Sequence, residues 1–67
     1  MSNKIEELKK EIQSLEQKLD EFNEDSKEFW PEMNKFQRAD AIREREKIEE
    51  VIEEKENELQ ELEEILN

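Results

Sequence analysis

The side chains of this chain that could do chemistry are almost all carboxylates. The sequence has 22 Asp and Glu residues, no His and no Cys, so the usual general bases and thiolate ligands are missing. Glu49 and Glu53 illustrate the i,i+4 spacing at which two carboxylates share one helix face. Such a pair works as general acid and base only in a cleft that sets their pKa values apart. A short helical chain offers little enclosure, so we expect a solvated acidic face and no enzyme.

Metal and cofactor sites also lack their necessary residues. Carboxylate metal sites in helical bundles combine Glu with His at i,i+3. EF-hand loops and phosphate-binding loops need Gly, and the chain contains neither His nor Gly. The three serines, Ser2, Ser14 and Ser26, have no partner base of the kind found in catalytic triads. We therefore expect no catalytic residue, no metal and no cofactor.

The carboxylates are concentrated in the last third of the chain, where they oppose the helix that carries them. Residues 44–64 contain eleven glutamates and only three cations. Like-charge pairs at i,i+4, such as Glu46 with Glu50, each cost a few tenths of a kcal/mol, and acids in the last turns oppose the helix dipole. This cost indicates a role other than stability. The candidate partner-binding surface, the acidic face, comprises Glu46, Glu49, Glu50, Glu53, Glu54, Glu56, Glu58, Glu61, Glu63 and Glu64.

The overall charge limits the partners of this surface. A net charge of -11 argues against direct binding of nucleic acid and of anionic membranes, and no apolar run approaches the ~20 residues of a membrane span. No apolar stretch of a signal peptide begins the chain, so we expect a cytoplasmic protein. Residues 44–67 carry about one net charge per 4–5 Å of helix, from the rise of about 1.5 Å per residue. Two such helices side by side approach the density of duplex DNA, about one per 1.7 Å.

A second candidate surface lies at the centre of the chain. Arginines at positions 38, 43 and 45 follow a group of large apolar residues, and residues 35–43 carry a net charge of +2. Aromatic and Arg side chains are typical interface hot spots. The alternative is that the apolar residues close the end of a bundle while Arg43 and Arg45 pair with acids on the neighbouring helix. We expect this of all but Trp30, whose ring could equally remain partly exposed as an anchor. The group comprises Phe29, Trp30, Met33 and Phe36.

The elements that position these surfaces are two helices. The first follows the 3,4 spacing of a coiled-coil seam and is predicted at about 3–23. A capping box of Asn3 with Glu6, or Ser2 as the N-cap, would begin it. Its seam residues are Ile5, Leu8, Ile12, Leu15, Leu19 and Phe22.

The turn-prone residues at 23–26, with a possible new cap of Asp25 and Glu28, and the proline that follows place a connection at about 24–30. The second helix is then predicted at about 31–66, with Pro31 in its first turn. Lys55 occupies one core position in its seam, either to set the register or with its head reaching solvent. The other seam residues are Ile48, Ile52, Leu59, Leu62 and Leu66.

The fold class that this pattern predicts is all-α: one domain, residues 1–67, formed by a hairpin of two long amphipathic helices. Since Phe29, Met33 and Phe36 continue the first seam, with Ser26 as the defect, one long helix kinked at Pro31 is the alternative. In a hairpin, we expect the first helix to cover only the first half of the second. The exposed half, about 49–66, then predicts a homodimer or helical bundle, parallel or antiparallel.

The function that these features favour is non-catalytic. The first hypothesis is a small acidic protein that occludes a basic surface of a partner protein, as a DNA-mimic inhibitor of a nucleic-acid-binding protein does. Small acidic inhibitors of phages and mobile elements are similar in size, charge and helicity. The alternative is a structural or adaptor coiled coil that engages partner helices through its apolar seam. A third possibility is a chain that folds only on binding.

Overall fold

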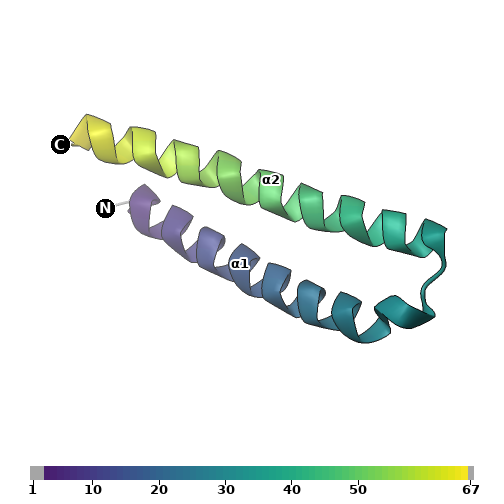
Figure 1. Cartoon of the computed structure of the whole chain (residues 1–67). Coiled ribbons are helices and arrows are strands. Elements are labelled where there is room, and N and C mark those ends of the chain that lie inside the picture. Colours follow the sequence, from purple (N-terminus) through teal and green to yellow (C-terminus); the bar gives the residue numbers. More distant parts are fainter. Residues whose placement is uncertain (1–2, 67) are drawn as a thin grey trace.

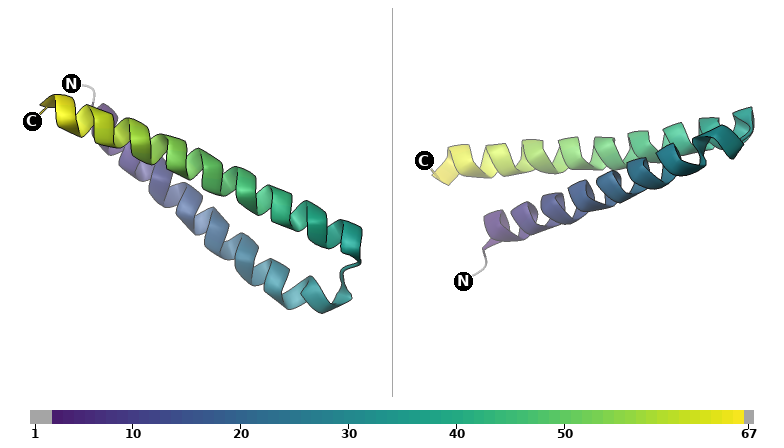
Figure 2. Two further views of the ribbon diagram at one scale, coloured as in Figure 1. Left: turned by 45° about the horizontal axis from the view of Figure 1, so that its top comes forward. Right: turned by 60° about the horizontal axis from the view of Figure 1, so that its bottom comes forward.

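The chain forms an antiparallel helical hairpin. The computed structural model describes the backbone of residues 3–66 and the side chains of residues 3–65. Helix α1 spans Lys4–Phe29, a 3-10 turn η1 spans Trp30–Glu32, and helix α2 spans Lys35–Leu66. The two helices lie side by side in a rod of 49 × 15 × 14 Å, with the start of α1 and the end of α2 at one end (Figures 1 and 2). The predicted hairpin is confirmed, and the kinked single helix is wrong.

The connection lies later in the chain than predicted. The polar stretch at 23–26 is helical, and α1 continues to Phe29, because exposed polar residues cost a helix only a few tenths of a kcal/mol each. Pro31 lacks the N–H that an α-helix requires and would clash with the preceding turn. It therefore lies in η1 and does not open α2. Met33 follows in an extended conformation, with φ -79° and ψ 140°, and this extended residue reverses the chain.

A reciprocal cap starts α2 at Lys35. The Gln37 backbone N–H donates to the Asn34 Oδ1 at 2.8 Å, and the Asn34 N–H donates to the Gln37 Oε1 at 3.0 Å. This capping box is visible in the sequence as Asn-x-x-Gln, and the prediction overlooked it in favour of Pro31. At α1, Asn3 is the N-cap without a side-chain hydrogen bond, so the predicted box with Glu6 is wrong. The alternative cap, Ser2, lies outside the described residues.

Removing the Asn34 cap should destabilise the hairpin. We expect Asn34→Ala to lower the free energy of unfolding by about 1 kcal/mol, since the Gln37 backbone N–H loses its side-chain partner, the Asn34 Oδ1. Asn57→Ala is the matched control, because Asn57 is exposed inside α2, where Ala is the better helix former. Thermal unfolding followed by circular dichroism measures both. An equal midpoint for the two variants would show that the cap does not stabilise α2.

The core is a narrow line between the two helices. Leu8, Ile12 and Ile52 are buried, with 4%, 8% and 7% of their surface exposed. The other described seam positions are half-buried, namely Ile5, Leu15, Leu19, Phe22, Ile48, Leu59 and Leu62. The side chain of Leu66 lies outside the described residues. No helix of the described chain is both long and apolar enough to cross a membrane.

The helices pair along most of their length, which corrects a second prediction. The Lys4 Nζ lies 3.6 Å from the Glu58 Oε1, and the Lys55 Nζ donates to the Glu11 Oε2 at 2.7 Å. The start of α1 therefore lies beside the last third of α2. The expectation that the second half of α2 is uncovered is wrong, because α1 is longer than predicted and the chain reverses near its middle. What α2 leaves exposed is its outer side.

Candidate functional site

The ten glutamates of the acidic face are all exposed on α2. Among the described side chains, ion pairs reach only Glu49, 3.7 Å from the Arg45 Nε, and Glu58, 3.6 Å from the Lys4 Nζ. The two lysines within residues 46–64 are engaged by acids outside the set. Lys47 lies 3.9 Å from Glu44, and Lys55 lies 2.7 Å from Glu11. Most of the negative charge of this surface is therefore balanced only by solvent ions.

Half of the acidic face forms a line, interrupted at Asn57, on the side of α2 opposite α1. At about 100° per residue, five of the ten glutamates fall within an arc of about 80° on the side of α2 away from the seam. We call this line the outer acidic strip. It consists of Glu46, Glu50, Glu53, Glu61 and Glu64. Residues 46–64 hold ten glutamates and two lysines, so the net charge of -8 gives about one charge per 3.5 Å of helix. One strand of DNA carries about one charge per 3.4 Å.

The charge of α2 opposes its helix dipole at both ends. The first turn contains no acid and the last turn contains no base, although acids stabilise a helix N-terminus and bases a C-terminus. Residues 35–45 carry four cations and two acids, whereas residues 46–64 carry the net charge of -8. The two ends of α2 therefore carry opposite net charge, with a basic start at the turn and an acidic end beside the start of α1.

Lys55 connects the seam to α1. Its stem occupies a seam position with 29% of the side chain exposed, and its Nζ donates to the Glu11 Oε2 at 2.7 Å. The hydrogen bond to Glu11 raises the pKa of Lys55, partly offset by desolvation, and the charges of Glu11, Glu58 and Glu54 raise it further. The stem packs in the seam, as the second interpretation expects, while the head contacts Glu11 on α1. The role of Lys55 in setting the register stays a prediction.

Alkaline pH should weaken the hairpin through Lys55. Because the folded state holds this proton more tightly, the stabilisation is complete below the unfolded pKa of about 10.4 and is lost as pH rises through the raised pKa. We expect Lys55→Met to lose less stability than the wild type between about pH 9 and pH 11.5, as urea unfolding would show. Lys9→Met, at an exposed α1 position, should behave like the wild type. An equal loss in both variants would contradict the assignment.

The central apolar group is arranged differently from the prediction. Phe29 and Phe36, expected to close the end of the bundle, are 50% and 71% exposed, whereas Trp30 and Met33 are half-buried. The reason is a change of helical phase at the end of α1. The seam pattern predicts Phe29 on the inner side, but η1 begins one residue later and turns Trp30 inward instead. We call Trp30 with Arg38 the turn corner. The predicted pairing of Arg43 and Arg45 with the neighbouring helix is also wrong: their ion pairs are with Asp40 and Glu49 on α2 itself.

Arg38 holds the turn corner together. Its Nε and Nη2 both donate to the Trp30 carbonyl oxygen, at 3.1 and 2.9 Å, and its guanidinium lies 5.2 Å from the centre of the Trp30 ring. The carbonyl thus gains a bidentate charged donor and the ring a cation–π contact. The prediction missed Arg38 as a structural residue. The signal available in the sequence was that Arg38 lies fourteen residues before Ile52, on a core position of the α2 heptad. A cation at such a position needs a hydrogen-bond partner.

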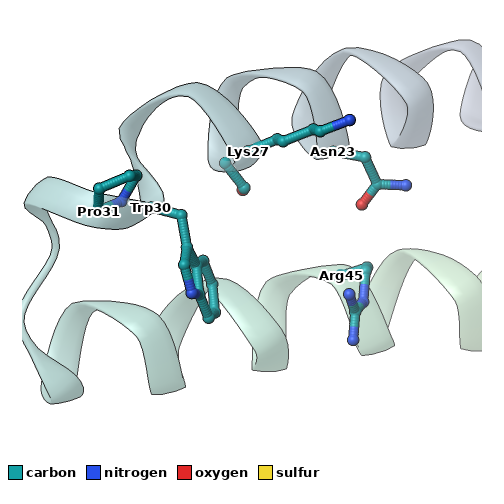
Figure 3. Close-up of a pocket in the computed structure, with 6 residues that line it drawn as sticks. Asn23, Lys27, Trp30, Pro31 and Arg45 are labelled. Atoms are coloured by element: carbon teal, nitrogen blue, oxygen red, sulfur yellow. The ribbon is translucent and has the colours of Figure 1, made fainter.

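A groove of about 440 Å³ opens beside the turn corner. Figure 3 shows the Trp30 ring reaching from the connection toward α2, with Asn23 and Lys27 on α1 and Arg45 across from them. Ser26, predicted as a seam defect, is half-buried and lines the same groove. A small side chain at this seam position leaves the helices underfilled here, so the groove is a consequence of packing. Its lining includes two cations, Lys27 and Arg45, and no acid.

Removing Arg38 should loosen the turn corner. We expect Arg38→Ala to lower the free energy of unfolding by about 1–2 kcal/mol, from the loss of charged hydrogen bonds and of the ring contact. Trp30 is the only Trp, so its fluorescence should also shift to the red as the ring meets water. Lys18→Ala removes an exposed cation of α1 and should change neither property. Unchanged emission in Arg38→Ala would contradict the assignment.

Within the part of the chain that the structure describes, no cluster of three or more acids could hold a metal ion, and no buried side-chain nitrogen or oxygen lacks a hydrogen-bond partner. Comparisons of the chain with protein-family models, curated proteins and solved structures found no match. Function therefore has to be inferred from the acidic face and the turn corner themselves.

Proposed function

We propose that this protein is a non-catalytic interaction protein that binds a basic surface of a partner protein through the outer acidic strip. The observation that carries the proposal is the state of the charges on α2. Ten exposed glutamates lie within residues 46–64, and the lysines among them pair with Glu44 and Glu11, which lie outside the set. A surface kept anionic at a cost to its own helix suits a partner that supplies the missing cations.

The partner class that fits best is a nucleic-acid-binding protein. The outer acidic strip lies on a rod 49 Å long, and the helix segment 46–64 that carries it has about one net charge per 3.5 Å, close to one DNA strand. A groove that binds the phosphate backbone by charge and shape can accept such a rod in place of DNA. The protein would then act as an inhibitor by occupying the groove. We further propose that it works in the cytoplasm as a homodimer.

The adaptor function remains the second candidate. It requires the apolar seam to engage partner helices, but the seam is already occupied, with Leu8, Ile12 and Ile52 buried between α1 and α2. An adaptor of this kind would have to open the hairpin and expose these side chains. The exposed outer acidic strip needs no such rearrangement, which favours the acidic-binding proposal.

A capture experiment separates the two candidates. The purified protein is immobilised and offered a cell lysate at about 50 and 300 mM salt, since screening weakens charge-driven contacts over this range. Our proposal predicts a nucleic-acid-binding protein that is retained at low salt and released both by high salt and by added duplex DNA. Retention of a helical protein that resists salt and DNA would overturn the proposal and support the adaptor.

A further inference from the structure

An unpartnered stripe runs along one side of α2. Phe36, Val51 and Ile65 remain 71%, 38% and 78% exposed, although they are large apolar side chains. At about 100° per residue, the three lie within about 60° of one another. They occupy the start, the middle and the end of one helix, on a flank of α2 that α1 leaves open. Exposed apolar residues that share one flank over the whole length of a helix indicate a docking surface.

The charges along this stripe complement those of a second copy of the stripe that runs antiparallel to it. Arg43 and Lys47 precede Val51, and Glu54 and Glu58 follow it, all of them exposed. Residues at equal distances from the middle of α2 are complementary. Phe36 corresponds to Ile65 at the two ends, and the cations Arg43 and Lys47 correspond to the anions Glu58 and Glu54. The α2 stripe consists of Phe36, Arg43, Lys47, Val51, Glu54, Glu58 and Ile65. Asp40 and Glu61 form the one like-charge opposition at equal distances from the middle.

We propose that two copies of this chain associate antiparallel through the α2 stripe, about a two-fold axis beside Val51. Phe36 then meets Ile65 of the second copy, and Lys47 meets its Glu54, because a two-fold interface places the same patch of both copies in contact. Each of these contacts occurs twice. The inference rests on the proposed dimeric state and adds its surface and its direction, neither of which the heptads could supply.

Charge along α2 selects the antiparallel arrangement. In a parallel pair, the two segments 46–64 would lie side by side, each with a net charge of -8. In the antiparallel pair, residues 56–66 of each copy run beside residues 35–45 of the second copy, where four cations outnumber two acids, and only residues 46–55 meet their own counterparts. The first arrangement brings like charges together over several turns, and the second brings unlike charges together.

The exposed area of the single hairpin is consistent with a partner. Its accessible surface is 5805 Å², whereas a compact folded chain of 8.2 kDa has about 4,500 Å². The excess exceeds the ~800 Å² that one protomer buries in a standard interface. The centre of the outer acidic strip lies about 90° around α2 from the centre of the stripe, with Glu61 at their shared edge. A dimer would therefore still present the rest of both strips, one toward each end.

Cysteine cross-linking tests the direction of the pair. The chain contains no Cys, so single substitutions report cleanly. We expect Phe36→Cys and Ile65→Cys chains, mixed and mildly oxidised, to form a disulfide-linked heterodimer, while neither chain cross-links to itself. Self-linkage of Ile65→Cys would indicate a parallel pair and overturn the proposal. Absence of any cross-link, together with a monomeric mass for the wild type at about 100 µM in sedimentation equilibrium, would overturn it as well.

A charge swap tests the surface. Lys47→Glu and Glu54→Lys should each weaken dimerisation about tenfold or more, since every reversed contact occurs twice, and the double variant should regain wild-type association. Failure of the double variant to recover would reject the stripe. Glu53→Lys makes the same charge change on the outer acidic strip. It should leave the dimer intact and weaken partner capture, so loss of the dimer and loss of the proposed function are separate outcomes.

Discussion

Reversing three charges of the outer acidic strip is expected to abolish partner binding without unfolding the protein. In Glu50→Lys/Glu53→Lys/Glu64→Lys, three lysines would face the basic surface of the partner. Like charges brought together at an interface cost several kcal/mol, so we expect affinity to fall by about a hundredfold or more, at about 1.4 kcal/mol per tenfold. Isothermal titration with the captured partner measures the change.

The variant should at the same time gain stability. The substitution Glu50→Lys places a cation four residues from both Glu46 and Glu54, converting two repulsive i,i+4 pairs into attractive ones worth a few tenths of a kcal/mol each. Weaker binding therefore could not be attributed to an unfolded variant. Thermal unfolding by circular dichroism provides this check, and a lower midpoint would contradict the view that the acids oppose their own helix.

A matched variant distinguishes the effect of the position of the reversed charges from the effect of the net charge of the protein. Glu7→Lys/Glu21→Lys/Glu28→Lys reverses three exposed acids of α1 and changes the net charge by the same amount. We expect it to retain partner affinity within about tenfold, since only long-range steering is weakened. Equal losses in the two triple variants would show that net charge, and not the outer acidic strip, determines binding.

Truncation of Ile12 is the second change with a large expected effect. Among the described side chains, Ile12 is one of three that are buried, with 8% of its surface exposed, and Ile→Ala in a core costs about 2–5 kcal/mol. A chain of this length has about 3–10 kcal/mol in total. We therefore expect Ile12→Ala to be largely unfolded or to melt at least 10 °C lower, at about 4–8 °C per kcal/mol for small domains.

The control for this loss is the same substitution at an exposed position. Ile42 is 37% exposed and lies outside the α2 stripe, so Ile42→Ala should cost less than about 1 kcal/mol. Both variants are compared with the wild type at one protein concentration, because dimerisation makes the melting temperature depend on concentration. Similar midpoints for Ile12→Ala and Ile42→Ala would show that the seam between α1 and α2 is not the main source of stability.

The inner side of the hairpin could be predicted from the sequence, because it depends on periodicity. The 3,4 spacing from Ile5 to Phe22 and from Ile48 to Leu62 identifies the positions that are buried or half-buried. The connection could not be placed correctly from the same pattern. Its position depends on the competition between Pro31, which ends α1, and the Asn34 cap, which starts α2 only after an extended residue.

The central surface was harder to predict than the acidic face. The exposure of the acidic face follows from charge alone, because an unpaired glutamate is expensive to bury. Which aromatic residue turns inward depends on one residue of phase at the end of α1, and that phase is set by η1. The role of Arg38 follows only when the Trp30 carbonyl is seen within its reach.

Competition between this protein and duplex DNA for one partner tests the central claim most directly. The partner captured from lysate is titrated with the protein at several fixed concentrations of duplex DNA, at constant salt. Our account predicts mutually exclusive binding, with an apparent Kd that rises in proportion to the DNA concentration. A ternary complex, in which the partner holds DNA and this protein together at an unchanged Kd, would contradict occupation of a nucleic-acid-binding surface by the outer acidic strip.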